Sequence, residues 1–145
     1  VSFPHPGPTS KHPLQPLPPT TKTRLLVVIG AAETQDQSRR TGIEQVASQL
    51  ADFAVFTEED YRTEPLEEIL ETMARAHGDP RRYVLVPDRR EAIRYALKEA
   101  RPGDTVLFSG KGHERTLERG VEVIPWNEVE EVRLALGELG RKAES

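Results

Sequence analysis

A glycine-rich loop late in the chain carries three side chains that could bind a ligand. Residues 110–114 read Gly-Lys-Gly-His-Glu and follow the apolar run Thr105–Phe108. Glycines at the carboxyl end of a buried strand let the backbone approach a ligand, and open α/β sheets bind their ligands at that edge. Lys111, His113 and Glu114 would converge on such a ligand, so this loop is the first candidate site.

The loop does not match the common phosphate-binding motifs. A Walker loop needs a glycine, four residues, Gly-Lys and then serine or threonine, whereas here Gly112 follows Lys111 and no glycine stands at the required distance before it. The segment Gly30 to Glu33 lacks the second and third glycines of the dinucleotide fingerprint. The motifs therefore argue against a Walker-type nucleotide site and against bound NAD.

Composition narrows the class of protein. A chain of 145 residues suits one domain, and a net charge of -4 with both signs interspersed argues against nucleic acid or a membrane surface as a partner. The absence of cysteine excludes disulfides and thiolate metal sites. No apolar run approaches the roughly 18 residues of a membrane span, and the N-terminus lacks the order of a signal peptide. We expect a cytoplasmic location.

Two parts of the chain differ in composition. Seven of the twelve prolines lie within Val1–Thr20, which predicts an extended, polyproline-like arm or linker over residues 1–23. Short apolar runs alternate with amphipathic segments from Arg24 onward. This alternation predicts one folded domain over residues 24–145.

Strand and helix signals alternate along that domain. Apolar runs predict strands at 25–29, 52–57, 83–86, 105–108 and 121–124. An amphipathic stripe predicts a helix around residues 43–50. A second helix is expected to begin at a Thr63 cap, with Pro65 in its first turn, and to end at Gly78. Two more are expected from an Asp88 cap to Ala100 and from an Asn127 cap to Leu139. We expect a Rossmann-like α/β fold with a mainly parallel sheet of five to six strands, flanked by helices. Residues 121–124 are the candidate for an antiparallel edge strand, because the loop before them is too short for a crossover helix.

This topology gathers three polar loops at one edge of the sheet. Residues 30–40, 57–62 and 109–114 each follow a predicted strand, and the carboxyl ends of parallel strands share an edge. We call this edge the rim, and it is the candidate site.

Four motifs, in this order, resemble the Mur ligase family, most closely the C-terminal domain of the MurE type. They are the run from Arg24 into the loop after Gly30, residues 51–57, the Val-Pro-Asp-Arg-Arg-Glu-Ala-Ile run at 86–93, and residues 103–114. The resemblance spans about residues 24–139, and the segment from Val1 to Pro6 corresponds to the family's link between central and C-terminal domains. Ligases of this type add a third residue, usually a diamino acid, to UDP-N-acetylmuramoyl-dipeptide in peptidoglycan synthesis.

The resemblance also implies a mechanism. In such ligases a central domain uses ATP and magnesium to phosphorylate the substrate carboxylate, and the C-terminal domain closes over it with the incoming amine. This chain carries no Walker loop, so the resemblance implies a ligase fragment or relic that needs a Mur ligase central domain as partner. We expect no cofactor, metal ligand or catalytic residue in this chain alone. The implied ligands are ornithine, lysine or diaminopimelate, together with UDP-N-acetylmuramoyl-dipeptide.

By resemblance, the amino acid would be bound by Asp60, Arg62, Gly110 and Glu114. Glu114 would hold the distal ammonium beside the Gly110 backbone, and Arg62 suits bidentate binding of a carboxylate. Asp60 replaces the amide of an Asp-Asn-Pro-Arg-like family motif, and Tyr61 replaces its proline, which leaves the identity of the amino acid open. Simpler roles also stay open: Glu114 as a solvated carboxylate or a partner of Arg115 or Arg119, and Arg62 as a partner of Glu58 or Glu64.

Other residues would lie on the nucleotide or phosphate side. Lys111 is either a cation facing phosphate or an exposed side chain, and His5 is either the counterpart of the family's linker histidine or a polar residue of a flexible arm. Asp36 follows Gln35 where the family has an arginine, and Arg40 or Arg39 either compensates or is simply exposed. We expect His113 to order its loop by hydrogen bonding.

Two other functions remain open. The chain could be a non-catalytic binding or interaction domain derived from a Mur ligase. It could also be the lid of a related folylpolyglutamate-type or cyanophycin-type ligase. The rim is the predicted site under the ligase hypotheses.

Overall fold

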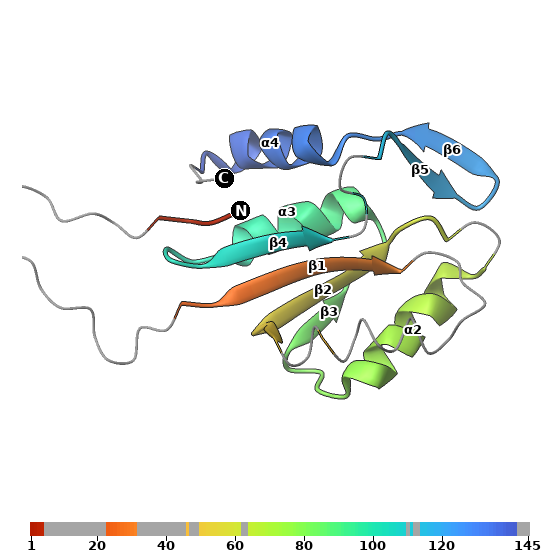
Figure 1. Cartoon of the computed structure of the whole chain (residues 1–145), viewed down its shortest axis with the longest axis horizontal. Coiled ribbons are helices and arrows are strands. Elements are labelled where there is room, and N and C mark those ends of the chain that lie inside the picture. Colours follow the sequence, from red (N-terminus) through yellow and green to blue (C-terminus); the bar gives the residue numbers. More distant parts are fainter. Residues whose placement is uncertain are drawn as a thin grey trace, which may run out of the picture.

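The computed structural model describes residues 1–4, 23–31, 46, 50–61, 64–109, 111 and 114–141. Its centre is a parallel sheet of four strands in the order β3-β2-β1-β4 (Figure 1). The strands are β1 (Leu25–Ala31), β2 (Phe53–Glu58), β3 (Tyr83–Leu85) and β4 (Thr105–Ser109). The predicted mainly parallel α/β fold is confirmed, but the described main sheet has four strands and not the expected five to six.

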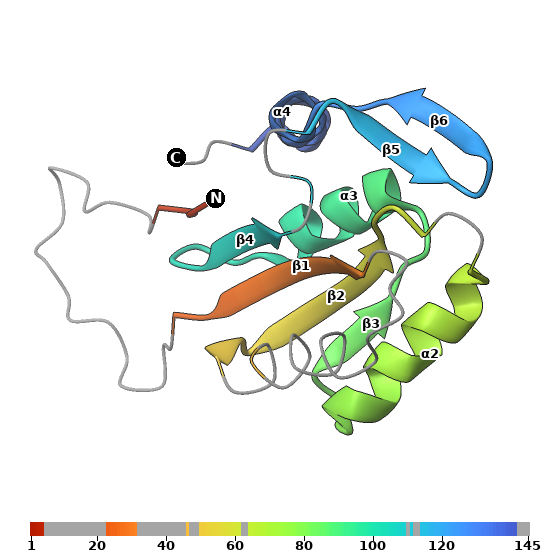
Figure 2. The same cartoon turned by 45° about the vertical axis from the view of Figure 1, so that its right-hand side comes forward.

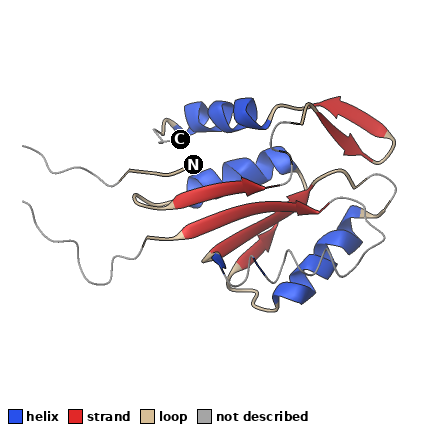
Figure 3. Ribbon diagram, viewed as in Figure 1, coloured by secondary structure: helices blue, strands red, loops and turns tan. Residues whose placement is uncertain are grey.

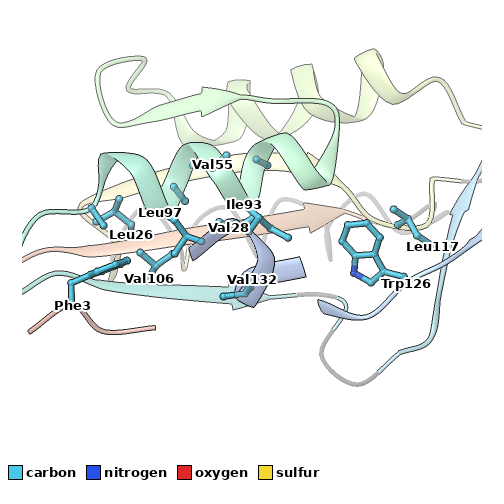
Figure 4. Packing of buried hydrophobic residues seen from close by; sticks show 14 residues of the cluster. Phe3, Leu26, Val28, Val55, Ile93, Leu97, Val106, Leu117, Trp126 and Val132 are labelled. Carbon is cyan, nitrogen blue, oxygen red and sulfur yellow. The ribbon is translucent and has the colours of Figure 1, made fainter. Parts of the chain in front are cut away.

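Helices cover both faces of the sheet (Figure 2). Helix α2 (Leu66–His77) lies on one face, and α3 (Arg89–Glu99) lies on the other, with α4 (Glu128–Leu139) packed against α3. Alternate residues of β1 serve the two faces: Val28 packs with α3 and α4, and Val27 packs with α2. Figure 4 shows the first of these clusters, in which Ile93 and Leu97 of α3 are fully buried.

Two of the helix starts follow their predicted cap signals. The side chain of Asp88 accepts a hydrogen bond from the Glu91 N–H at 3.1 Å, and Asn127 accepts one from the Glu130 N–H at 3.1 Å. Such bonds satisfy backbone donors that have no partner within the helix. Both predicted N-caps are confirmed.

The predicted start of α2 needs a correction. Pro65 is the N-cap residue, with an extended backbone and no capping side-chain bond, and it was expected inside the first turn. The expected cap residue, Thr63, lies outside the described residues. The end of α2 is confirmed, because Gly78 adopts the left-handed conformation with φ of 81°.

Residues 121–124 do not form an edge strand of the main sheet, so that expectation was wrong. Strands β5 (Thr116–Arg119) and β6 (Glu122–Pro125) pair with each other as a separate antiparallel sheet (Figure 3). Gly120, with φ of 58°, lies in the turn between them. Strand β5 was not predicted, because Leu117 is its one buried residue and no apolar alternation marks it.

The first residues of the chain lie against β4. Ser2 forms an antiparallel bridge with Thr105, and the Phe3 side chain is 3% exposed within the core. The Arg141 guanidinium lies 4.0 Å from the centre of the Phe3 ring. Residues 5–22 of the predicted arm lie outside the described residues.

The helix predicted around 43–50 is described at two positions only. Val46 and Leu50 are helical, and their exposed fractions are 53% and 68%. Among the described helices, none is long and apolar enough to cross a membrane.

Candidate functional site

Acidic residues follow β2 and β4 at the rim. β2 ends at Glu58 and is followed at once by Glu59 and Asp60, and Lys111 and Glu114 come shortly after the end of β4. β1 lies between β2 and β4 in the parallel sheet, so the two acidic segments leave the same edge. The predicted convergence of these loops is confirmed for Asp60, Lys111 and Glu114.

Lys111 is fully buried and binds two carboxylates. Its Nζ donates to both carboxylate oxygens of Asp60 at 3.0 Å and to Oε2 of Glu114 at 2.5 Å. Burial lowers the pKa of Lys111, but the hydrogen bonds and charges of Glu114 and Asp60 outweigh it and raise the pKa overall. The alternative of an exposed Lys111 was wrong.

The carboxylates of Asp60 and Glu114 differ in their exposure to solvent and in the hydrogen bonds that they accept. Oδ1 of Asp60 also accepts a hydrogen bond from the Glu118 N–H of β5 at 2.8 Å, and its side chain is 18% exposed. The Glu114 side chain is 48% exposed, and among the described residues its Oε1 accepts no hydrogen bond. Glu114 is therefore the carboxylate of this pair that can still meet a ligand.

Glu59 is a third carboxylate at the rim, and it was not among the predicted site residues. It is half-buried, and within the described part of the chain its carboxylate makes no hydrogen bond or ion pair. Burial raises its pKa most, Arg89 and Lys111 oppose this, and Asp60 and Glu114 add to it. Glu59 closely follows a predicted buried strand, and this position could have marked it as a candidate site residue in the sequence.

A buried arginine holds the ends of the strands beneath the rim. The Arg89 guanidinium donates to the backbone oxygens of Glu58 at 3.1 Å and Ser109 at 2.9 Å, which joins β2 to β4. Its Nε donates to the Glu128 carboxylate at 3.0 Å and 3.2 Å, which joins both strands to α4. Arg89 is wholly buried, and Glu128 is 5% exposed and also accepts from Trp126 Nε1 at 2.7 Å.

The end of β1 reaches this network through Gly30. A Cβ atom at Gly30 would lie 2.7 Å from the Glu58 backbone oxygen and 2.8 Å from an Arg89 guanidinium nitrogen. The Glu58 carboxylate is bound by Arg119, whose Nε donates a hydrogen bond to Oε1 at 2.7 Å. Glycine at position 30 is therefore required by close packing, since any side chain would displace the backbone or Arg89.

The remaining predicted site residues are not placed. His5, Asp36, Arg40, Arg62 and Gly110 lie outside the described residues, as does His113. Within the described part of the chain, Glu114 pairs with Lys111, and Arg119 pairs with Glu58 and Asp88. The same part holds no group of three or more side chains suited to a metal ion.

Known proteins resemble this chain in both sequence and structure. The family model for the Mur ligase glutamate ligase domain matches residues 10–112. The UDP-N-acetylmuramyl-tripeptide synthetase of Deinococcus radiodurans is 49% identical over 141 residues, covering 95% of this chain and 29% of that protein. A UDP-N-acetylmuramoyl-L-alanyl-D-glutamate--2,6-diaminopimelate ligase of Geobacillus kaustophilus is 37% identical, covering 97% of this chain and 29% of that protein.

A solved structure agrees with these relatives. The structure of a UDP-N-acetylmuramoyl-L-alanyl-D-glutamate--2,6-diaminopimelate ligase superimposes with a TM-score of 0.75 at 31% identity. The match covers 83% of this chain and 25% of that one. This chain thus spans less than a third of the length of the relatives it matches.

Proposed function

The chain belongs to the Mur ligase family as a C-terminal domain, and from this premise we propose that its rim binds the amino acid that the whole ligase adds. The observation that carries the proposal is the surplus of acid at the rim. Among the described residues of the rim, Asp60 and Glu114 bind the one ammonium, that of Lys111, and the Glu59 carboxylate lies close enough to feel its charge. A ligand with an ammonium group of its own would balance this charge.

The class of ligand follows from the same charges. A diamino acid such as ornithine, lysine or diaminopimelate carries a second ammonium at the end of its side chain. The Glu114 side chain is 48% exposed, so its Oε1 could accept a hydrogen bond from that ammonium while Oε2 stays on Lys111. The Geobacillus kaustophilus relative is named as a 2,6-diaminopimelate ligase, which is consistent with this class.

The proposed reaction needs parts beyond this domain. We propose that the whole ligase holds ATP, magnesium and UDP-N-acetylmuramoyl-dipeptide on its other domains, and that this domain closes over them. Its own contribution is to fix the amino acid by its distal ammonium, so that the reacting amine is presented in one orientation. Closure would also exclude water from the acyl phosphate.

Amide chemical shifts of the labelled chain test the binding site. Titration with ornithine, lysine and diaminopimelate is expected to shift the amides of Asp60, Lys111 and Glu114. Glu114→Gln should weaken binding about fivefold, equivalent to ~1 kcal/mol for a partly exposed ion pair. Glu71→Gln, on the exposed side of α2, is the matched control and should bind as the wild type does.

Two results would contradict the proposal. If no diamino acid shifts any rim amide, the amino-acid site is refuted, and the non-catalytic interaction domain becomes the better hypothesis. If glutamate shifts the rim amides and diamino acids do not, the folylpolyglutamate-type alternative is favoured.

A further inference from the structure

We propose that the proline-rich segment, residues 5–22, is a connection within this domain and not the link between domains that its composition suggests. The residues that flank it are both bound to residues 103–105, at the start of β4, so residues 1–4 form one rigid body with the rest of the domain. The inference goes beyond the proposed function and takes one premise from it, that the whole ligase closes by a movement between domains. The pivot of that movement then lies outside residues 5–22.

The chain before the segment is bound along the free edge of β4. The Phe3 N–H donates to the backbone oxygen of Asp104 at 2.8 Å, and the Phe3 oxygen accepts from the Gly103 N–H at 2.7 Å. Further along the strand, the Val106 N–H donates to the backbone oxygen of Val1. These backbone bonds hold the first residues of the chain as an antiparallel addition to the sheet.

The Phe3 side chain anchors this addition in the core. It is 3% exposed and belongs to the cluster that also contains residues of α3 and α4 (Figure 4). The Arg141 guanidinium lies 4.0 Å from the centre of the Phe3 ring and donates to the backbone oxygens of Leu97 and Ala100 at 2.7 Å and 2.5 Å. The ring is therefore enclosed between the core and a cation that is itself bound to the end of α3.

The chain after the segment is bound to the same residues. The Arg24 N–H donates to Oδ1 of Asp104 at 3.0 Å, and the Arg24 guanidinium donates to Oδ2 at 2.8 Å and 3.1 Å. The Thr105 N–H donates to the Arg24 backbone oxygen at 2.9 Å. Asp104 is 1% exposed and also accepts from the Arg101 N–H at 2.8 Å. Asp104 thus binds Phe3 through its backbone and Arg24 through its side chain.

The two ends of the segment are close together. Thr105 lies between Ser2 on one side and Leu25 of β1 on the other, at one end of the sheet (Figure 2). Adjacent strands are about 4.8 Å apart, so the two flanking chains are separated by about 10 Å. Eighteen extended residues could span about 60 Å. The segment is far longer than the gap that it crosses, so its length does not determine where residues 1–4 lie.

The direction of residues 1–4 bears on closure. Val1 lies beside Val106, towards the rim, and Phe3 lies beside Gly103, at the opposite end of β4. A domain joined to this one at Val1 would therefore stand on the side of the rim, where the proposed function needs it. The proline-rich segment begins and ends away from that side.

Nuclear magnetic resonance relaxation of the labelled chain tests the proposal. We expect backbone order parameters of about 0.85 for the Ser2 and Phe3 amides, the value of a rigid backbone, because both belong to the body of the domain. Values below about 0.6 would overturn the proposal. In a second chain, six glycine and serine residues replace residues 7–22, which retains His5 and still crosses the gap. Its order parameters at Ser2 and Phe3 should equal those of the wild type, and a fall on shortening would also overturn the proposal.

Phe3→Ala tests the anchor by hydrogen exchange. The Gly103 and Val106 amides, which donate to residues 1–4, should exchange about tenfold faster or more, the equivalent of one lost hydrogen bond. The Thr105 amide, which donates to the chain that leads into β1, should change less. Leu107→Ala, at a 53% exposed position of the same strand, is the control and should leave all three rates near those of the wild type.

Equal exchange rates in Phe3→Ala and in the wild type would contradict the proposal. If Phe3→Ala does not fold, the order parameters of the wild type and of the shortened chain still decide the question. None of these measurements uses an amino acid as ligand, so a failure of the proposed amino-acid site would leave their outcome unchanged and the two failures are distinguishable.

Discussion

Arg89→Met should destabilise the domain more than removal of any exposed arginine. The change leaves the Glu128 carboxylate, 5% exposed, with the Trp126 Nε1–H as its remaining hydrogen-bond donor among those described. It also removes the donors to the backbone oxygens of Glu58 and Ser109. Removing one partner of a buried ion pair costs about 3–5 kcal/mol. Since domains are typically stable by about 5–15 kcal/mol, the variant would be marginally folded.

Urea unfolding provides the measurement. Trp126 is the single tryptophan of the chain and lies in this network, so its fluorescence reports the region directly, and far-UV circular dichroism reports the whole fold. Agreement of the two curves would justify a two-state free energy. The control is Arg94→Met, since Arg94 pairs with Glu91 and Glu138 on the surface, and its midpoint should stay near that of the wild type.

A second variant tests the cause of the effect. In Arg89→Met with Glu128→Gln the amide oxygen can still accept from Trp126, while the uncompensated buried charge is gone. The double variant should therefore recover about 2 kcal/mol or more relative to Arg89→Met alone, as coupled residues do. An Arg89→Met variant no less stable than Arg94→Met, or a double variant that recovers nothing, would refute the idea that Arg89 stabilises the rim by pairing with Glu128.

Two further predictions concern Glu59 and the glycines. The raised pKa of Glu59 means that the folded state holds its proton to higher pH than the unfolded state, so stability falls as pH rises through the folded pKa. Glu59→Gln should therefore be more stable than wild type at pH 7, and urea midpoints should converge at acidic pH; a difference that grows on acidification would contradict this. Gly30→Ala should cost about 1–3 kcal/mol because its Cβ would lie 2.7 Å from a backbone oxygen, whereas Gly137→Ala, a helical position with open space, should stabilise by about 0.5–1 kcal/mol in the same assay.

Local signals predicted much of the fold. The apolar run at 25–29 has the pattern of a strand buried on both faces, and the spacing of Asp88 and Glu91 is that of a helix start; the structure confirms both. Both patterns involve residues that are close together in the sequence, so they can be recognised without the structure. The pairing of β5 with β6 could not be predicted in the same way, because β5 has no apolar alternation of its own and its one buried residue, Leu117, joins a core cluster formed by distant parts of the chain.

The partners of the Lys111 ammonium could not be predicted from neighbouring residues in the sequence either. A lysine between two glycines is typical of an exposed loop, and nothing near it in the sequence reveals that Asp60, 51 residues earlier, binds its ammonium. The pairing exists because β2 and β4 both flank β1 and therefore end at one edge. The order of the strands was predictable from the sequence, but Asp60 could be identified as the partner of Lys111 only from the distances between their atoms in the structure.

The charges at the rim are arranged in two layers with different consequences. In the lower layer Arg89 is enclosed with Glu128, and Arg119 binds Glu58, so both fix strand ends and neither cation is available to a ligand. In the upper layer one lysine serves two carboxylates, and a third carboxylate, Glu59, has no partner in the described part of the chain. Among the described residues, the carboxylates of the upper layer thus outnumber its one cation, while the cations of the lower layer are already paired. Under the proposed function, Asp60 and Glu114 are held in place by Lys111 before a ligand arrives, which would reduce the reorganisation that binding an ammonium requires.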